Sequence, residues 1–473
     1  MTTNLVSRVP ADLPATFKGP VHRRGEAGFS AAREIWNMWR ADDQPALIVA
    51  PLDVDDVVVA VHHAVREDLA IAVHSGGHGI DGTAMPDGAF VVDTSQLKGI
   101  AIDPATGRVT IGAGVRLGEL DAATQEHGLV VPAGVVTDTG AAGLTLGGGI
   151  GHNTRRFGAT VDNLICVDIV TTDGRVVTAS ADQEPELFWG LRGAGHNLGI
   201  ATSFTYQGHQ LGPQVMSGLI AFAADDAPGV FERVDEVMAR SPRELAVALL
   251  VLRAPPLPGL PEHLRGTPIL GALVVYTGEL DRYESAIGDF LGLATPLANL
   301  VRPCTWLEAN SFVDRFEPPG RRRHMIGGYL PGLTAEMGRI CVDALATSPP
   351  PKTRLPACLI TLPILGGALF DQDEDSTAFS RTGAEWLIEV TSEWDEPADD
   401  AVYAPWADET FALLQPHLAS NAYINLTVDR GAEWLRGAYG SAAKWERIVA
   451  LKKAWDPDNR LCYNKNVTRA AES

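Results

Sequence analysis

The sequence has few of the features that mark membrane, metal-binding or disulfide-bonded proteins. No run of about 18 apolar residues occurs, so we expect no membrane-spanning helix. Its five cysteines are odd in number and form no CxxC pair, which argues against a disulfide framework or a zinc site, and HExxH is also absent. The first residues, MTTNLVSRVPADLPATF, lack the apolar segment of a secretory signal. We therefore expect a cytoplasmic protein with no metal site and no membrane association.

Basic residues are the minority among the charged side chains. Lysine and arginine number 38 against 59 aspartate and glutamate, a formal net charge of -21. Such a surface repels phosphate backbones and acidic membranes, so nucleic acid is not an expected partner. The only dense basic cluster spans residues 321–324, and we interpret it as a solvated loop or a salt-bridge site between elements, not as an anion-binding site.

The length and composition indicate a globular, loop-rich protein of two domains. The chain has 473 residues, 45% of them hydrophobic, with 48 glycines and 31 prolines. Glycine-rich stretches are frequent up to about residue 208. From residue 209 the segments are longer and more apolar, with prolines gathered in 255–261 and 349–356. This change predicts that a different domain begins there.

Local patterns predict alternating helices and strands. Asp53 can cap a helix that carries valines at helical spacing, and Ser441 can cap another that stops at Asp456-Pro457. Asp173-Gly174 is typical of a hairpin turn. The predicted strands are 69–73, 89–93, 99–103, 108–111, 164–171 and 176–179, with a helix over 117–127.

Three glycine-rich loops occur within about 130 residues, at 75–79, 139–151 and 193–199. Consecutive small residues expose backbone N–H groups without interference from Cβ atoms, which suits close approach by a pyrophosphate. No Gly-Lys-Ser/Thr closes a Walker loop, and no strand–GxGxxG–helix unit opens the chain near an acidic residue. The loops therefore predict a large dinucleotide held by another kind of fold.

One histidine, His78, lies inside the first loop between Gly77 and Gly79. Its imidazole is expected to project from backbone that contacts the cofactor. The alternative is a structural histidine that hydrogen-bonds a turn carbonyl.

These loops, in this order, resemble the FAD-binding domain of the berberine-bridge-enzyme-like family within the vanillyl-alcohol-oxidase superfamily. The resemblance extends through Val91-Val92-Asp93, Phe157-Gly158 and 186–193, and returns near the C-terminus in Tyr423-Ile424-Asn425, Asp456-Pro457-Asp458-Asn459 and Asn464-Lys465-Asn466, the last of which is similar to the family's closing strand. It implies an α+β fold: a PCMH-type two-subdomain FAD-binding domain (1–208), an inserted substrate domain of antiparallel sheet and helices (209–415) whose sheet roofs the isoalloxazine ring, and a C-terminal segment returning to the FAD domain (416–473).

The resemblance also implies how the cofactor is held. His78 matches the histidine that the family joins to the flavin 8α-methyl group, and His74 replaces the usual arginine at the start of that motif. Val136 stands where some members carry a second attachment cysteine, so FAD is expected to be linked once. Thr139 falls on the position that gates oxygen and is small. The implied cofactor-binding residues are His74, Ser75, Gly76, Gly77, His78, Gly79, Val136, Thr139, Gly140, Gly143, Gly147, Gly148, Gly149, Gly151, His152, Gly199, Ile200, Asn464 and Asn466.

The catalytic candidates are fewer. Tyr423 is the first candidate proton acceptor, although a tyrosine on a strand is otherwise a packing residue. His152 is a second candidate base, or a packing residue at a helix start. Asn425 can hold the flavin or a substrate oxygen, and Thr139 and Leu144 border the expected oxygen pocket. The glutamate that the family often carries before Gly366-Gly367-Ala368 is missing from 359–365, which predicts an apolar pocket.

The resulting expectation is an FAD-dependent oxidase that takes a hydride from an alcohol, amine or activated carbon of a small molecule, in bacterial secondary metabolism, and returns the electrons to molecular oxygen. The alternatives are an oxygenating flavoenzyme of polyketide biosynthesis, a flavin-bound cyclase without net redox, and a non-catalytic FAD-binding protein. Neither the substrate nor the oligomeric state follows from the sequence.

Overall fold

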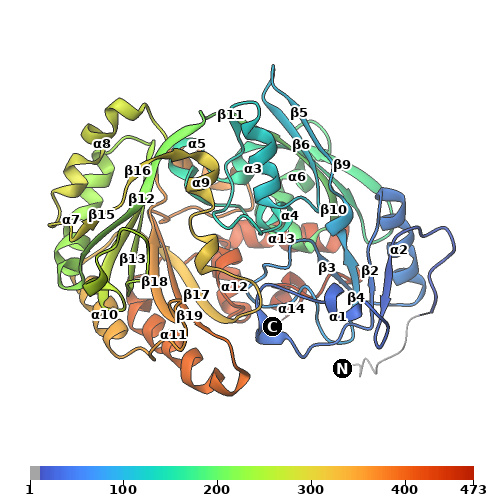
Figure 1. The fold of residues 1–473 in the computed structure, drawn as a ribbon. Helices are drawn as coiled ribbons and strands as arrows, with labels where there is room; N and C mark the ends of the chain where they lie inside the picture. The colour runs from blue at the N-terminus through green and yellow to red at the C-terminus, as the bar shows by residue number, and fades with distance from the viewer. Residues whose placement is uncertain (1–10, 473) are drawn as a thin grey trace.

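The computed structural model describes residues 11–472 and divides them between two regions of sheet and helix, which Figure 1 shows side by side. The region on the right of Figure 1 holds a four-stranded sheet of order β1-β2-β4-β3, in which β2, β4 and β3 are parallel. It also holds an antiparallel five-stranded sheet of order β5-β6-β10-β8-β9. The strands are β1 Val21–Arg23, β2 Leu47–Val49, β3 Ile71–His74, β4 Phe90–Asp93, β5 Ile100–Asp103, β6 Arg108–Gly112, β8 Leu164–Val170, β9 Val176–Ser180 and β10 Ile200–Gln207, with β7 Leu129–Val130 pairing β11 His209–Gln210.

The region on the left is built on one large antiparallel sheet with the order β15-β12-β14-β13-β18-β19-β17 and with β16 paired to β12. Four helices, α7, α8, α10 and α11, pack against one face of this sheet. The strands are β12 Gln214–Ala223, β13 Leu245–Arg253, β14 Pro268–Tyr276, β15 Ala298–Asn299, β16 Arg302–Thr305, β17 Arg322–Leu330, β18 Cys358–Pro363 and β19 Trp386–Trp394.

The helices are α1 Phe29–Ala32, α2 Val54–Arg66, α3 Leu117–Gln125, α4 Ala141–Leu146, α5 Thr154–Phe157, α6 Pro185–Ala194, α7 Ala227–Arg240, α8 Tyr283–Leu291, α9 Trp306–Asn310, α10 Ala335–Ala346, α11 Asp400–Leu414, α12 Ala432–Ala438, α13 Ala442–Trp455 and α14 Val467–Glu472. Both predicted N-caps are confirmed: Asp53 accepts a hydrogen bond from Asp56 N at 2.9 Å, and Ser441 accepts one from Lys444 N at 3.1 Å. None of the helices within residues 11–472 has the length and apolar character needed to cross a membrane.

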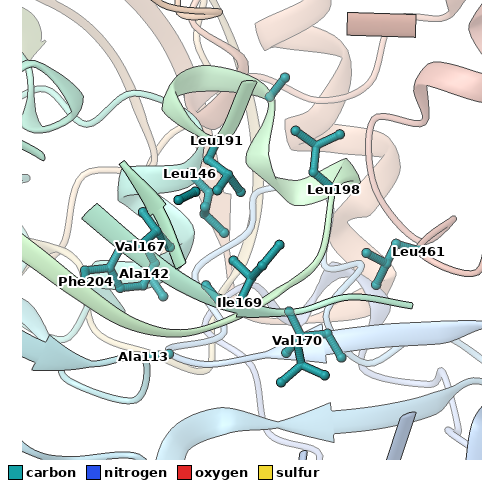
Figure 2. Packing of buried hydrophobic residues seen from close by; sticks show 14 of the residues in the cluster. Ala113, Ala142, Leu146, Val167, Ile169, Val170, Leu191, Leu198, Phe204 and Leu461 are labelled. Atoms are coloured by element: carbon teal, nitrogen blue, oxygen red, sulfur yellow. The ribbon is translucent and has the colours of Figure 1, made fainter. Parts of the chain in front are cut away.

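The core of the first region joins residues from both ends of the chain. Ala142 and Leu146 of α4 and Leu191 of α6 pack above Ile169 of β8, as Figure 2 shows. Buried residues of α13 and α14 belong to this same cluster, so these two helices pack on the N-terminal half. Burial of such side chains is the main stabilising contribution to the arrangement.

Several local predictions need correction. The strand predicted at 69–73 is β3, Ile71–His74, so His74 belongs to the strand. Tyr423 precedes a 3₁₀ turn, Ile424–Leu426, and is not on a strand. The closing strand expected at 464–466 is irregular backbone that leads into α14. The second glycine loop contains a helix, α4, because its central residues Ala-Ala-Gly-Leu-Thr-Leu include good helix formers.

The basic cluster at 321–324 is buried rather than solvated, so the loop alternative is wrong and the salt-bridge alternative is confirmed. Arg321 lies 2.5 Å and Arg323 3.2 Å from the Glu393 carboxylate on the paired strand β19. Arg322 contacts Asp400 of α11 at 2.7 Å. The charges can be buried because each has an opposite partner within hydrogen-bond distance.

Candidate active site

A cavity of about 490 Å³ lies where the glycine loops meet the large sheet. Its lining comes from all three loops on one side and from β13, β18 and β19 on the other. The 3₁₀ turn after Tyr423 and residues 463–465 complete the wall. Ligand sites in enzymes are concave and mostly apolar with a few convergent polar groups, which is the character of this lining.

The three glycine loops, far apart in sequence, converge here. A Cβ atom on Gly76 would lie 2.2 Å from the backbone nitrogen of Gly140, so the first two loops touch backbone to backbone. His196 in the third loop bonds the carbonyl oxygen of Gly143 in the second at 2.9 Å. The loops therefore form one continuous backbone surface at the cavity.

Not all the glycines serve the same purpose. A Cβ on Gly147 would collide with the Asn425 amide at 2.0 Å, and one on Gly148 would collide with Phe379 at 2.5 Å. The missing side chains at these two glycines leave room for Asn425 and Phe379. In contrast, a Cβ on Gly79 or Gly143 would meet nothing within 4 Å, and both residues line the cavity. At these two positions the bare backbone faces open space that a cofactor can approach.

His78 lines the cavity with its side chain 11% exposed. Its ring stacks on Trp36 at a centroid distance of 4.9 Å and an interplanar angle of 19°. Arg323 is buried, and its guanidinium group lies 3.8 Å from the centroid of the Trp36 ring. Burial, and then the charges of Arg323 and Arg116, lower the pKa of His78 to about 3. The imidazole is therefore neutral at pH 7.

Two polar groups set the orientation of the neutral His78 ring. Thr139 Oγ1 is 3.3 Å from Nδ1, and Asp138 Oδ2 is 3.5 Å from Nε2. Asp138 also pairs with Arg116. Because the imidazole is uncharged, its contact with Asp138 is a long hydrogen bond rather than an ion pair. A neutral imidazole, which keeps a lone pair on one ring nitrogen, is the form that acts as a nucleophile.

His74 does not line the cavity. Its Nδ1 lies 2.8 Å from the Asp93 carboxylate on the neighbouring parallel strand β4. Burial alone would raise the pKa of Asp93, but the hydrogen bond and charge interaction with His74 outweigh it and lower the pKa. A Cβ on Gly77 would lie 2.8 Å from His74 Nε2, so His74 packs under the first loop and supports it.

Tyr423 is poorly suited to accept a proton. Its hydroxyl oxygen already accepts hydrogen bonds from Gly149 N at 3.1 Å and from Asn425 Nδ2 at 3.0 Å. Burial raises the pKa of Tyr423 to about 12, so the phenol keeps its proton at pH 7. The hydroxyl hydrogen remains free to donate toward the cavity, which fits a role in orienting a substrate oxygen.

His152 and Tyr439 bring unpartnered polar atoms to the wall. His152 Nε2 and Tyr439 Oη are buried, and neither has a hydrogen-bond partner among residues 11–472. Burial lowers the pKa of His152 to about 4. Unpaired buried polar atoms are costly, so a bound group that bonds them would be stabilised.

The carboxylate that seemed absent from the sequence is supplied by another strand. Glu389 of β19 lines the cavity. It pairs in register with Thr361 of β18, and Thr361 lies within the segment 359–365 that lacks a glutamate. No hydrogen bond or ion pair to its carboxyl group is found in the described part of the chain. Burial raises the pKa of Glu389 to about 8. The glutamate is indeed missing from 359–365 and the lining is mostly apolar, but the neighbouring strand places a carboxyl group in the cavity.

Sequence reasoning missed Glu389 because it searched one strand rather than its neighbour. A usable signal exists in the sequence Trp-Leu-Ile-Glu-Val-Thr-Ser-Glu-Trp, where two glutamates interrupt a buried strand. Charged residues are almost never fully buried unless they are paired, or unless function requires them. Glu393 is paired with arginines, which leaves Glu389 as the functional candidate.

Most of the predicted site residues come together at the cavity. Those that line it are Ser75, Gly76, Gly77, His78, Gly79, Val136, Thr139, Gly140, Gly143, Leu144, Gly151, His152, Gly199, Tyr423, Asn425 and Asn464. Those that lie behind the lining are His74, Gly147, Gly148, Gly149, Ile200 and Asn466. Ile200 is buried in β10, and Asn466 bonds Asn459 and Leu461. No group of three or more His, Cys, Asp or Glu suited to a metal ion occurs within residues 11–472.

Comparisons with known proteins agree with this geometry. Residues 45–180 match the FAD binding domain family. An FAD-linked oxidoreductase of Dictyostelium discoideum is 28% identical over 96% of this chain and 95% of its own length, and (R)-6-hydroxynicotine oxidase of Paenarthrobacter nicotinovorans is 27% identical over 96% and 97%.

Solved structures show the same fold. The crystal structure of 6-hydroxy-D-nicotine oxidase from Arthrobacter nicotinovorans superposes with a TM-score of 0.84 at 26% identity, covering 96% of this chain and 98% of that one. The berberine-bridge-enzyme-like protein 1 of Physcomitrella patens reaches a TM-score of 0.83 at 24% identity, covering 94% and 96%. The chain is therefore an FAD-dependent oxidoreductase. Its fold is that of the berberine-bridge-enzyme-like, PCMH-type flavoproteins, as the sequence resemblance predicted.

Proposed function

We propose that the protein is an oxidase that carries FAD covalently attached through His78 and oxidises a small molecule with molecular oxygen as acceptor. The observation that carries the proposal is His78 itself: a neutral, ring-stacked imidazole at the cavity wall, in a loop whose neighbour Gly79 faces open space. Val136, which also lines the cavity, has no sulfur for a second attachment. A single covalent link is thus proposed.

The remaining residues fit oxidation of a C–H bond that carries a hydroxyl or amino group. FAD accepts the hydride when it is bound. Glu389 takes the proton of the substrate O–H or N–H, since its raised pKa makes it a stronger base than an ordinary glutamate once it is ionised. Tyr423 donates a hydrogen bond to the substrate oxygen, and Asn425 holds the Tyr423 hydroxyl in place. Hydride and proton leave the substrate, which becomes a carbonyl or imine.

Molecular oxygen is the proposed final acceptor. Thr139 and Leu144 both line the cavity, and the small Thr139 side chain leaves space beside the neighbouring ring of His78. Oxygen would return as hydrogen peroxide. Incorporation of ¹⁸O from ¹⁸O₂ into product would instead indicate oxygenation, and anaerobic turnover without flavin bleaching would indicate a cyclase.

The first test is acid precipitation of the purified protein, followed by peptide mapping for flavin mass. We expect a yellow pellet with the flavin on the His78 peptide and none on the Val136 peptide. His78→Ala should release the flavin into the supernatant, whereas His127→Ala, an exposed histidine elsewhere, should not. Complete release of flavin from the unmodified protein would refute the covalent link.

A further inference from the structure

One face of the large sheet forms a long apolar wall of the cavity. Side chains alternate along a strand, so every second residue of β13 points the same way. Leu245, Val247, Leu249 and Val251 pack on the helices. The wall on the opposite face is formed by Ala246, Ala248, Leu250 and Leu252 of β13 with Leu359 of β18.

The wall becomes less polar with distance from Glu389. In the sheet register, Glu389 lies beside Thr361, and Thr361 lies beside Leu250. Toward the start of β18 the polar groups end, and Leu252 pairs with Leu359. Leu257, Phe312 and Phe316 line the same part of the cavity, and they share one hydrophobic cluster with Leu252. A ligand extending in this direction meets mostly aliphatic and aromatic groups, with the Glu317 carboxyl group also in the lining.

A second, basic pocket adjoins this wall and shares two lining residues with the cavity. The second pocket has a volume of about 440 Å³, and Pro255 and Pro356 line both cavities. From Thr361 the strand reaches its first residue, Cys358, after roughly 10 Å at about 3.3 Å per residue, and Pro356 is two residues further. The basic pocket therefore begins on the order of 15 Å from the Glu389 row.

Three arginines, Arg253, Arg265 and Arg354, line the basic pocket, and none of the described residues that line it is acidic. No ion pair or side-chain hydrogen bond from these guanidinium groups is found among residues 11–472, and Arg253 Nε is buried without a partner. Arg265 and Arg354 are exposed and Arg253 is half-buried, so on a chain of net charge -21 this pocket gathers positive charge that a ligand can reach.

The pocket is also held in shape. Ala254 N donates to Thr267 O at 2.9 Å and Gly266 N donates to Ala254 O at 2.8 Å, which close the loop that carries Arg265. Prolines at 255, 256, 351 and 356 restrict both loops at the pocket. Guanidinium groups present paired donors that match carboxylate and phosphate oxygens.

We propose that the substrate is an amphipathic anion: an oxidisable alcohol or amine end at Glu389, an apolar middle along β13 and β18, and a terminal carboxylate or phosphate at Arg253, Arg265 and Arg354. The assignment of the oxidised end rests on the proposed function. The anion site and the apolar wall stand on the geometry of the two pockets.

The test is calorimetric titration of the holoprotein with straight-chain alkanoates of increasing length, their neutral alkanamides, and alkyl phosphates. Burying each methylene group should tighten binding about fourfold until the wall is filled. Removing the charge, alkanoate to alkanamide of equal length, should weaken binding at least about tenfold. Tighter binding of alkyl phosphates than of alkanoates would assign the end group as phosphate, and the reverse as carboxylate.

Substitutions of the pocket arginines test whether the preference for a charged end group arises in the basic pocket. Arg265→Gln with Arg354→Gln should remove the preference for alkanoates over alkanamides. Arg243→Gln, which deletes a half-exposed arginine paired with Asp371, should leave the preference intact. Equal affinity for alkanoates and alkanamides, or a preference that survives the double variant, would overturn the proposal. Because calorimetry needs no turnover, this result is independent of whether the flavin is covalent or oxygen is the acceptor.

Discussion

Replacement of Glu389 by glutamine is the sharpest test of how this site moves protons. The glutamine keeps the size of the side chain and its register beside Thr361 but cannot ionise. General-base catalysis by a positioned side chain contributes roughly 10²- to 10⁴-fold. We therefore expect kcat to fall by about that factor, with the flavin content of the protein unchanged.

The raised pKa of Glu389 sets how strongly kcat/KM should depend on pH. Burial raises the pKa of Glu389 to about 8, so about 9% of the carboxyl groups are ionised at pH 7 and about 1% at pH 6. Since the ionised form is the base, kcat/KM should rise about tenfold from pH 6 to pH 7 and level off above pH 8. The Glu389→Gln enzyme should lose this limb of the profile.

The assay is oxygen consumption with a turning-over alcohol or amine, followed from pH 5.5 to 9.5, with anaerobic flavin bleaching measured in parallel. Glu433→Gln, an exposed glutamate of α12, serves as the matched control. A Glu389→Gln enzyme with normal kcat, or with an unchanged alkaline rise, would show that another group takes the proton.

Glu389 also gives a prediction for stability, and substitutions at three further positions test a ring stack, a buried ion pair and a helix cap. Because folding raises the pKa of Glu389 from 4.5, its ionisation opposes folding increasingly from about pH 4.5 to pH 8; Glu389→Gln should therefore raise Tm over wild type at pH 9 and much less at pH 5. Trp36→Leu removes the ring under His78 and should lower the acid-precipitable flavin fraction in freshly expressed protein, a result contradicted by full attachment. Asp162→Asn breaks a buried ion pair with Arg381, whose contact distance is 2.9 Å, and should cost about 3–5 kcal/mol in urea unfolding. Ser441→Ala should cost about 1 kcal/mol while Ser441→Asp costs little, because only alanine lacks an acceptor for Lys444 N.

Sequence reasoning located much of the cofactor side of the site. The glycine loops are contiguous, so their small residues and the order of the three could be read from the chain without knowing the fold. His78 stands inside the first loop, and the structure places it in the lining of the cavity. The capped helices α2 and α13 could also be predicted from the sequence, because capping and helical periodicity are properties of neighbouring residues.

The residues on the substrate side of the site could not be predicted from local sequence patterns. Glu389 reaches the cavity only because β19 pairs with β18, and strand pairing is not encoded in the local pattern of either strand. The stack of Trp36, His78 and Arg323 joins residues up to 287 positions apart. The raised pKa of Tyr423 likewise comes from burial, which one segment of the sequence cannot reveal.

The sequence by itself therefore determined the cofactor class, the glycine loops around His78 and the capped helices, because short-range signals such as glycine, caps and periodicity carry them. Only the tertiary structure decided which carboxylate faces the flavin side of the cavity, why His78 is neutral and where the unpaired arginines lie. Those properties depend on desolvation and on contacts between distant segments, and both arise only when the chain has folded.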